Sequence, residues 1–281
     1  MTTPPTLAST DTAGHLSGSG PGTDTALTIE GVTVTFGHGA SAKTALNGIT
    51  THVGRGRTVG LVGESGSGKS TLAKAIIGQH PPTSGRILLD GVDLATLGRR
   101  ERFAVRRRIQ LIPQDPYSSL DPRRTIGQAL AEAISPLHEN VRANKDRIAE
   151  WLEHVRLSPD SMHRYPHEFS GGQRQRIAIA RALIIEPEII IADEITSALD
   201  VSVQAEILAL VARLRQELGL TMLFISHNLA VIRQVSDDVV VLYHGDIVEQ
   251  SDAATLFASP AHNYTRALLS AVPGSPGFSI E

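Results

Sequence analysis

The sequence contains no cysteine and no long apolar run, and each absence excludes a class of protein. Without cysteine, its 281 residues can form no disulfide, no thiolate nucleophile and no cysteine-ligated metal site. This composition is compatible with a reducing compartment. No segment reaches the roughly 18 consecutive apolar residues of a membrane-spanning helix. The most apolar segment, residues 221–232, is too short and includes His227 and Asn228. Any role at a membrane is therefore expected to depend on a partner.

The sequence also has little net charge. Its formal net charge is −3 at pH 7, so no overall attraction to nucleic acid or acidic lipid is expected. Residues 97–108 form a strongly basic segment, with arginine at 99, 100, 102, 106, 107 and 108. In an acidic chain, such a segment is better explained as the exposed face of a helix than as a phosphate-binding patch. The 11 histidines are scattered without ligand spacing and give no support to a metal site of their own.

The sequence does contain the phosphate-loop pattern G-x-x-x-x-G-K-[ST], which begins at Gly63 and ends with residues 68–70. Residues 58–62 before it are typical of a buried strand, and residues 71–77 after it are typical of an apolar-faced helix. This context favours a functional loop over a chance glycine-rich turn. Its N–H groups can point inward toward an anion, and the helix N-terminus adds its dipole. The residues predicted to bind a nucleoside triphosphate are Gly63, Glu64, Ser65, Gly66, Ser67, Gly68, Lys69, Ser70 and Thr71.

Two acidic residues follow a second apolar segment. Residues 189–192 are all apolar and lead into Asp193 and Glu194. A phosphate-loop protein needs ligands for Mg²⁺, which the Ser70 hydroxyl and the Asp193 carboxylate can supply, and Lys69 reaches the β- and γ-phosphates. Glu194 is then placed to polarise the attacking water. A solvated acidic turn is the alternative, but two consecutive acids downstream of a phosphate loop favour catalysis.

A third apolar segment, residues 222–225, leads to His227. Open α/β sheets bind ligands at the carboxyl edge of their strands, where this imidazole is expected to lie. A lone histidine at such a place is more often structural. In this chain it fits a sensor of the γ-phosphate.

A second anion site is predicted at the start of another helix. Ser170, Gly171 and Gly172 precede an apolar helical segment, so their N–H groups are expected to point at a ligand. Gln173 completes the motif. One triphosphate does not need two such cradles within one chain. A simple explanation is that this one serves the nucleotide of a second subunit.

Together these motifs resemble the nucleotide-binding subunit of ATP-binding cassette (ABC) transporters, over residues 26–273. Residues 169–173, FSGGQ, are similar to the family signature LSGGQ, with Phe169 in place of leucine. The resemblance implies a phosphate-loop NTPase with the ABC-ATPase fold. This is an α/β fold with a mostly parallel core sheet, an antiparallel β subdomain and an inserted helical subdomain.

The resemblance also implies roles for residues outside the phosphate loop. Gln114 lies where the family's switch glutamine follows its strand, and it would bind Mg²⁺ and align water. Glu194 matches the general base and His227 the switch histidine, so the implied catalytic residues are Gln114, Glu194 and His227. Residues 197–200 match the loop that crosses the dimer interface. Phe36 is the candidate for stacking on the adenine of ATP, although an aromatic at the edge of the core is the alternative.

Three further segments are similar to the oligopeptide, dipeptide and nickel group of importers: residues 114–123, 164–169 and 262–269. Gln173 after the signature glycines resembles the second of the two ATPases that such systems usually carry. The sequence departs from the family pattern at two places, because Ile195 and Asn263 stand where the family usually has proline.

The implied function is a Mg²⁺-dependent ATPase that energises import of a small solute. Peptide is the favoured cargo, and nickel or a metal chelate is the alternative. The implied partners are a second ABC ATPase subunit, with a heterodimer favoured over a homodimer, and two integral-membrane permeases. An extracytoplasmic solute-binding protein is an indirect partner, and no nucleic acid is expected. The implied location is the cytoplasmic face of the cell membrane.

Two other functional classes fit the sequence less well. A soluble ABC ATPase acting on nucleic acid or the ribosome usually carries tandem cassettes, coiled-coil insertions or zinc motifs. This chain has one cassette, no cysteine and no heptad run. A small-molecule kinase would not account for residues 170–173.

The expected domain organisation is a disordered tail at residues 1–25, an ABC ATPase domain at 26–250 and a C-terminal extension of the peptide-importer type at 251–281, which is expected to be helical over 252–272 and loose beyond. The helical subdomain is expected at about residues 115–169, with Trp151 in its core. Residues 49–53 and 58–62 flank a Gly-Arg-Gly turn and predict a hairpin that leads into the phosphate loop. A second hairpin is predicted within residues 239–248.

Overall fold

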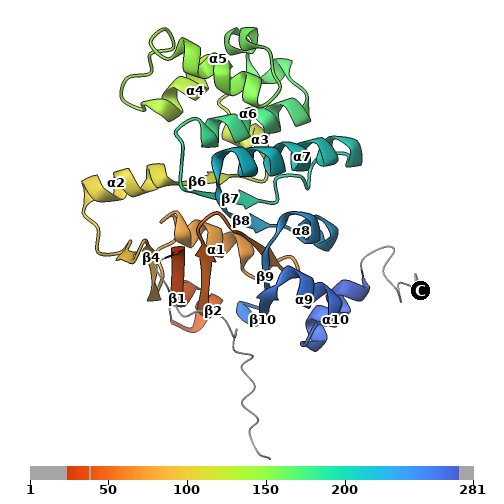
Figure 1. The fold of residues 1–281 in the computed structure, drawn as a ribbon. Coiled ribbons are helices and arrows are strands. Elements are labelled where there is room, and N and C mark those ends of the chain that lie inside the picture. Colours follow the sequence, from red (N-terminus) through yellow and green to blue (C-terminus); the bar gives the residue numbers. More distant parts are fainter. Residues whose placement is uncertain (1–23, 38, 272–281) are drawn as a thin grey trace, which may run out of the picture.

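The computed structural model describes residues 24–37 and 39–271, which form two sheets with helices between and beyond them (Figure 1). One sheet has four strands in the order β2-β1-β4-β5, and the other has six in the order β10-β9-β3-β8-β7-β6. The predicted N-terminal tail lies outside the described residues except at Asp24 and Thr25. Thr25 was expected in that tail, but it begins β1 and pairs with Gly54.

The four-stranded sheet is antiparallel. It consists of β1 (Thr25–Phe36), β2 (Lys43–Gly54), β4 (Ser84–Leu89) and β5 (Val92–Asp93), and a short 3₁₀ turn, η1 (Gly39–Ser41), connects its first two strands. Along β2, buried and exposed side chains largely alternate from Ile49 onward, as expected of a strand with only one face against the core.

The predicted hairpin between residues 49–53 and 58–62 is wrong. β2 pairs with β1 instead, placing Val53 opposite Leu27 and Ile49 opposite Val32. The chain then crosses to the other sheet, where β3 (Thr58–Val62) lies between β8 and β9 and is buried on both faces. The physical reason is burial, because a strand without exposed positions fits the centre of a parallel sheet better than an edge hairpin.

Most of the predicted site residues lie at the ends of strands in the six-stranded sheet. It is formed by β3, β6 (Ile109–Ile112), β7 (Ile189–Asp193), β8 (Thr221–Ile225), β9 (Asp238–Tyr243) and β10 (Asp246–Asp252). Its first five strands in sequence are parallel, and β10 returns antiparallel to β9, which confirms the second predicted hairpin. The carboxyl ends of β3, β6, β7 and β8 therefore meet at one edge.

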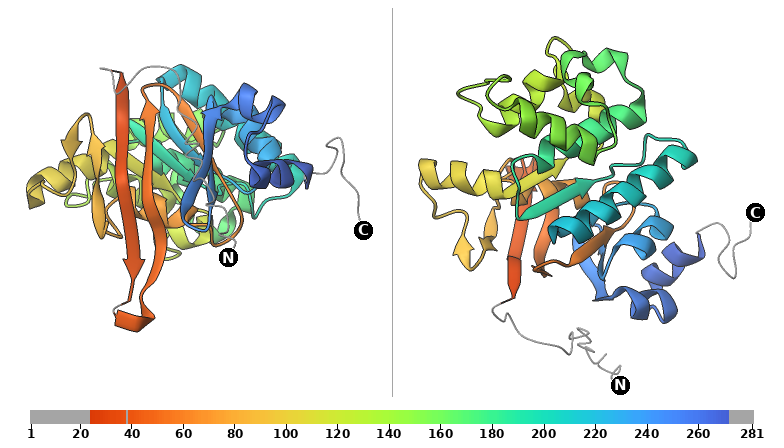
Figure 2. Two further views of the ribbon diagram at one scale, coloured as in Figure 1. Left: turned by 90° about the horizontal axis from the view of Figure 1, so that it is seen from below. Right: turned by 45° about the horizontal axis from the view of Figure 1, so that its top comes forward.

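Helices form separate layers on the two faces of this sheet. Helix α1 (Lys69–Ile76) lies between the two sheets, where it shares one core with β1, β2 and β3. Helices α6 (Gly171–Leu183), α7 (Val201–Leu218) and α8 (Leu229–Val235) cover the opposite face and share a second core. Figure 2 shows this layering from two other directions, with the green helices beyond the parallel sheet.

The segment between β6 and α6 is helical. It contains α3 (Pro116–Ser119), α4 (Ile126–Ile134), α5 (Lys145–His154) and the 3₁₀ turns η2 (Pro159–His163) and η3 (Pro166–Glu168). Trp151 on α5 is only 5% exposed, which confirms its prediction as a core residue. Helices α4 and α5 lie in the upper lobe in Figure 1, whereas α3 lies lower, beside α6. The basic segment forms α2 (Arg99–Arg108), which has no buried residue and thus confirms the predicted exposed helix.

The last described elements are helical, as predicted for the C-terminal extension. They are α9 (Ala253–Ala258) and α10 (Asn263–Ser270), so the expected helix is two short helices interrupted near Pro260. Helix α9 packs beside α8 and β10, and α10 follows it at the lower right in Figure 1. Over the described ranges 24–37 and 39–271, no helix combines the length and apolar character that crossing a membrane requires.

Candidate functional site

The phosphate loop connects β3 to α1, and Lys69 reaches back across it. The Lys69 ammonium donates hydrogen bonds to the carbonyl oxygens of Gly63 and Glu64 at 2.8 and 2.7 Å, and the residue is 5% exposed. Burial lowers the pKa of Lys69, while the nearby carboxylates of Glu194, Asp193 and Glu64 oppose that shift. The loop therefore holds a buried cation on its own carbonyl oxygens, at the position where the phosphate-loop pattern places phosphate.

Two glycines of the loop are required by close backbone contacts. Gly63 has φ +151°, and a Cβ there would lie 2.1 Å from the carbonyl oxygen of Leu242 on β9. Gly68 has φ +112°, and a Cβ there would lie 2.7 Å from the carbonyl oxygen of Ala45 on β2. A side chain at either position would push the loop away from the neighbouring strand, so the loop fits closely between β9 of one sheet and β2 of the other.

Ser70 and Asp193 meet at the start of α1. The Ser70 hydroxyl donates to Asp193 Oδ1 at 3.3 Å, across 123 residues of sequence. Asp193 is 8% exposed, and burial raises its pKa against the opposing effects of Ser70 and two lysines. No group of three or more His, Cys, Asp or Glu side chains in the described part of the chain could hold a metal alone. One hydroxyl and one carboxylate fit Mg²⁺ that also binds substrate phosphates.

Glu194 lies at the centre of the other predicted residues. Its Oε2 accepts a hydrogen bond from Gln114 Nε2 at 3.1 Å and lies 3.3 Å from His227 Nδ1. Its side chain is 17% exposed, whereas that of His227 is 60% exposed. The ends of three strands thus bring Gln114, Glu194 and His227 together, as the parallel order of the strands requires.

The backbone at Glu194 is strained, with φ +47° at a non-glycine residue. Its N–H donates to the carbonyl oxygen of Ile225 at 2.9 Å. Ser197 donates two hydrogen bonds to the carbonyl oxygen of Glu194, one from the Ser197 N–H at 3.0 Å and one from the Ser197 hydroxyl at 2.9 Å. Ser197 Oγ also accepts from Gln114 Nε2 at 3.3 Å. This positioning role of Ser197 was not predicted from the sequence, although the spacing of a serine three residues after the acid could have indicated it.

Ile195, where proline is usual in similar sequences, is 1% exposed and belongs to the core on the helical face of the sheet. The turn after Glu194 is thus anchored by a buried side chain. The Ser197 hydrogen bonds to the Glu194 carbonyl oxygen restrain the same turn from its other side.

The signature segment lies at the start of α6. Ser170 Oγ accepts from the Gln173 N–H at 3.3 Å, and the Ser170 N–H donates to Gln173 Oε1 at 3.0 Å, which together form a capping box. Gly171 and Gly172 form the first turn of the helix. No hydrogen bond or ion pair within residues 24–37 and 39–271 joins this segment to the phosphate loop. The chain does not bring its two predicted anion sites together.

Phe36 ends β1 and is 41% exposed. Its ring lies edge-on to the His80 ring, with centroids 5.2 Å apart. Stacking of Phe36 on adenine stays a prediction, since this geometry also fits an aromatic at the edge of the core.

A buried lysine in a phosphate loop, a hydroxyl–carboxylate pair and a shielded glutamate at one sheet edge define a phosphate-loop nucleoside triphosphatase. The protein-family model described as "ABC transporter" matches residues 46–197. A putative peptide import ATP-binding protein of Brucella ovis is 50% identical over 248 residues, covering 88% of this chain and 78% of the relative. The oligopeptide transport ATP-binding protein OppF of Salmonella typhimurium is 48% identical over 231 residues, covering 82% and 69%.

Solved structures agree with this assignment. The cbiO1 protein of Clostridium perfringens, described as part of the ABC transporter complex cbiONQ, has a TM-score of 0.74 at 28% identity, covering 84% of this chain and 92% of that one. The ATP-binding cassette MJ0796, described as a dimer bound to ADP and Pi, has a TM-score of 0.70 at 30% identity, covering 81% and 98%. The chain belongs to the ABC transporter family and is one of its ATPases.

Proposed function

We propose that this chain is the ATP-hydrolysing subunit of an importer and that peptide is its cargo. The observation that carries the ATPase role is the Glu194 carboxylate, which Gln114 and His227 hold at the sheet edge where Lys69, Ser70 and Asp193 also lie. The names of the relatives, a putative peptide import protein and an oligopeptide transport protein, support peptide as the cargo. Import of nickel or a metal chelate by the same group remains the alternative.

Each site residue then has a defined task. The phosphate-loop N–H groups and Lys69 bind the phosphates, and Ser70, Asp193 and Gln114 would hold Mg²⁺, which would neutralise charge on the phosphate oxygens. Glu194 accepts a proton from the attacking water, and His227 contacts the γ-phosphate. Because all these groups are present, the subunit's own phosphate-loop site is expected to be competent for hydrolysis.

A second ATPase subunit completes the site in this proposal. Ser170 and the following glycines form a helix N-terminus that is suited to an anion, and no hydrogen bond among the described residues joins it to the phosphate loop of the same chain. Two subunits arranged head to tail would place each signature opposite the other's Lys69 loop. Sequence similarity to the second ATPase of two-ATPase importers favours a heterodimer over a homodimer.

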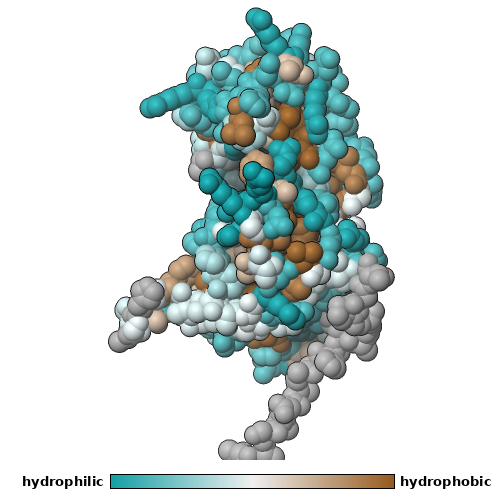
Figure 3. Space-filling view, turned by 90° about the vertical axis from the view of Figure 1, so that its left-hand side faces the viewer, coloured by the Kyte–Doolittle hydropathy of each residue, from teal (hydrophilic) through white to brown (hydrophobic). Residues whose placement is uncertain are grey.

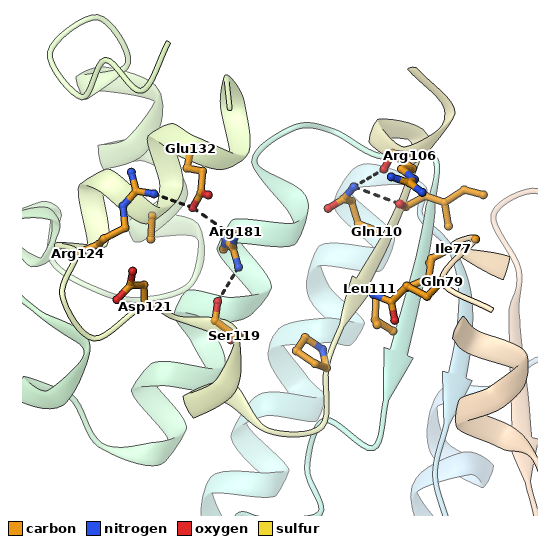
Figure 4. A pocket seen from close by; sticks show the side chains of 14 residues that line it. Ile77, Gln79, Arg106, Gln110, Leu111, Ser119, Asp121, Arg124, Glu132 and Arg181 are labelled. Atoms are coloured by element: carbon orange, nitrogen blue, oxygen red, sulfur yellow. Dashed lines mark hydrogen bonds and ion pairs between the residues drawn. The ribbon is translucent and has the colours of Figure 1, made fainter. Parts of the chain in front are cut away.

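A groove between the sheet and the helical lobe is the proposed docking place for a permease loop. Its volume is about 710 Å³, and its walls come from residues 77–79 after α1 and from α2, β6, α3, α4 and α6 (Figure 4). Arg124 and Arg181 there share Glu132 at 3.3 and 3.5 Å. The side chain of Arg106 has no such partner among the described residues, so a carboxylate on the permease loop would complement it.

The groove is connected to the catalytic carboxylate. Pro113 lines it, and the next residue, Gln114, binds Glu194. The surrounding face is hydrophilic with apolar areas in both the lobe and the body (Figure 3), and Phe103 beside the groove is 53% exposed. A loop docked there can therefore sense whether Gln114 is aligned, which would couple ATP-dependent closure to transport at the cytoplasmic face of the membrane.

The proposed domain organisation follows this division of tasks. An ABC ATPase domain at residues 26–250 contains a helical subdomain at about 115–169 that faces the permease. A C-terminal extension begins at residue 251.

A trapped complex tests the proposal. Glu194→Gln protein would be incubated with ATP and Mg²⁺ in native membranes, purified, and its partners identified by mass spectrometry. Two polytopic permeases and a second ATPase are expected, and labelled peptides would then be screened against the associated binding protein. Recovery of ribosomal or DNA-bound partners without a permease would overturn the transport function while leaving the ATPase chemistry in place.

A further inference from the structure

The C-terminal extension contacts the phosphate loop directly. The N–H of Glu64 donates to the Tyr264 hydroxyl on α10 at 3.0 Å, although the two residues are 200 positions apart. The β9–β10 turn makes a second contact, since the Gly245 N–H donates to the Ser67 carbonyl at 3.0 Å. Neither contact belongs to the phosphate-binding pattern itself. Both come from segments more than 170 residues downstream of the loop.

The peptide unit between Gly63 and Glu64 is bonded on both sides. Its carbonyl, on Gly63, accepts from Lys69 Nζ at 2.8 Å, and its N–H, on Glu64, donates to Tyr264. Because a trans peptide is planar, its C=O and N–H point in opposite directions and rotate together. The Tyr264 hydroxyl therefore helps to fix the direction of the carbonyl that holds the Lys69 ammonium.

This peptide unit needs such a restraint. Gly63 precedes it in a conformation that is strained for any other residue, with φ +151°. Glycine itself has few steric barriers to rotation, so the adjoining peptide is free to reorient unless hydrogen bonds hold it. Tyr264 supplies the hydrogen bond on the side facing away from Lys69.

Tyr264 is itself held firmly. Its ring packs on Tyr243 with centroids 4.2 Å apart, and its N–H donates to His262 Nδ1 at 3.2 Å, which caps α10. Glu249 on β10 accepts from the N–H groups of Ala261 and His262 at 2.8 and 2.9 Å. The start of α10 is thus tied to the edge of the parallel sheet.

The hydroxyl stays neutral. Burial raises the pKa of Tyr264, and the nearby Glu64 carboxylate raises it further against the lowering effect of the hydrogen bond from the Glu64 N–H. Tyr264 therefore offers a hydrogen-bond acceptor beside the phosphate loop without adding a negative charge that would repel a triphosphate.

We propose that Tyr264 is a positioning residue of the nucleotide site, through which the C-terminal extension holds the Gly63–Glu64 peptide and, with it, Lys69. This inference rests on the proposed ATPase function. It assigns to the extension a task in nucleotide affinity that is separate from cargo or permease recognition.

Tyr264→Phe tests the proposal, because it removes the hydroxyl and keeps the ring on Tyr243. The dissociation constant for ATP, measured with a fluorescent analogue in the Glu194→Gln background, is expected to rise about three- to tenfold, as for one lost hydrogen bond. In the otherwise wild-type chain, KM for ATP should rise by a similar factor with little change in kcat, because Lys69 contacts phosphate in both ground and transition states.

Tyr243→Phe is the matched control. No hydrogen bond of the Tyr243 hydroxyl is found in the described part of the chain, so neither the dissociation constant nor KM should change. The melting temperature without nucleotide should be the same for both variants, and only Tyr264→Phe should reduce the rise in melting temperature that ATP produces. Unchanged ATP affinity in Tyr264→Phe, with binding lost in Lys69→Ala, would overturn the positioning role alone. A wild-type chain that binds no ATP would overturn the proposed function instead.

Discussion

Glu194 combines a left-handed backbone with a carboxylate that two other strands hold in place. A backbone at φ +47° costs a non-glycine residue free energy, and the surrounding hydrogen bonds from Ser197 and to Ile225 maintain it. That strain directs the side chain toward Gln114 and His227 instead of along the strand. The conformation therefore serves the position of the acid.

Replacing this carboxylate by an amide should separate binding from hydrolysis. Glu194→Gln keeps the size of the side chain but removes the group that accepts a proton from water, so phosphate release should fall at least about 100-fold. ATP affinity should stay within about threefold, because Lys69 and the loop N–H groups are unchanged. Phosphate-release kinetics and binding of a fluorescent nucleotide measure the two effects.

The chain offers a control for this substitution. Glu186 also has a left-handed backbone, with φ +54°, and its carboxylate binds Arg147 at 2.8 Å away from the site. Glu186→Gln should leave hydrolysis unchanged. If Glu194→Gln still hydrolysed ATP at near the wild-type rate, another residue would have to be the base.

Asp193 should make the nucleotide-free protein less stable at neutral pH. Burial raises its pKa, so the folded state binds the proton more tightly than the unfolded state does. The stability that the protonated form contributes is present at low pH and is lost as pH rises through the raised pKa. At neutral pH the buried, ionised carboxylate is therefore unfavourable, and it is kept for its place beside Ser70.

Asp193→Asn should accordingly raise the melting temperature of the nucleotide-free protein at pH 7.5. A gain of about 1 kcal/mol corresponds to roughly 2–4 °C in a domain of this size. The difference in melting temperature between variant and wild type should shrink as the buffer is made more acidic. The variant should also lose Mg²⁺-dependent ATP binding. A variant with a lower melting temperature at neutral pH would show that the carboxylate is stabilising there.

The packing of α6 on α7 depends on a glycine of the signature. A Cβ at Gly172 would lie 2.4 Å from Val203 Cγ1, whereas a Cβ at Gly171 would have its nearest neighbour, on Leu199, at 3.7 Å. Gly172 thus allows close helix contact, and Gly171 is free of this restriction. The glycines in the motif therefore have different physical requirements, even though both precede the same helix.

Gly172→Ala should destabilise the chain by about 1–3 kcal/mol through overpacking, while Gly171→Ala should have little effect on stability. Adding Val203→Ala to the first variant should restore most of the loss, since it removes the methyl groups that the new Cβ meets. Thermal and urea unfolding of nucleotide-free protein measure this. Equal losses from the two alanine variants would contradict the packing argument.

The same elements show what the sequence could predict. The strand ends at Val62, Asp193 and Ile225 were predictable because each apolar segment is followed by residues that can bind or react with a ligand. The parallel arrangement of these strands then brings Lys69, Glu194 and His227 to one edge of the sheet. The partner of β2 was not predictable from its glycine turn, because such a turn can close a hairpin or lead to another sheet. The bond between Glu64 and Tyr264 was also beyond sequence reasoning, since no local pattern relates residues 200 positions apart.

The two proposals assign different tasks to the two sides of the six-stranded sheet. Tyr264 on α10 contacts the phosphate loop at one side of the six-stranded sheet, and the groove lies along β6, the strand at the other edge of that sheet (Figure 4). Glu194, Gln114 and Lys69 lie between these regions on neighbouring strands. Coupling to transport requires that a membrane partner affect ATP hydrolysis. Pro113 lines the groove, and the adjacent residue, Gln114, donates a hydrogen bond to Glu194, so the groove and the hydrolysis site are one residue apart in sequence.

Reversing one charge in the groove should therefore separate docking from catalysis. Arg106→Glu should reduce recovery of the permeases in the trapped complex at least about tenfold, because a carboxylate on the docked loop would face a like charge. Basal hydrolysis by the purified ATPase should change less than about twofold, since Arg106 makes no contact with Glu194, Gln114 or Lys69.

Arg100→Glu on the same helix is the control for this last experiment, because it changes the charge equally but does not line the groove. It should leave both permease recovery and hydrolysis near wild-type values. A charge-reversed permease loop, with its glutamate or aspartate changed to lysine, should restore docking to Arg106→Glu. Equal loss of docking in the two arginine variants would mean that the permease senses the overall charge of α2. In that case the groove would not be the place where the loop binds.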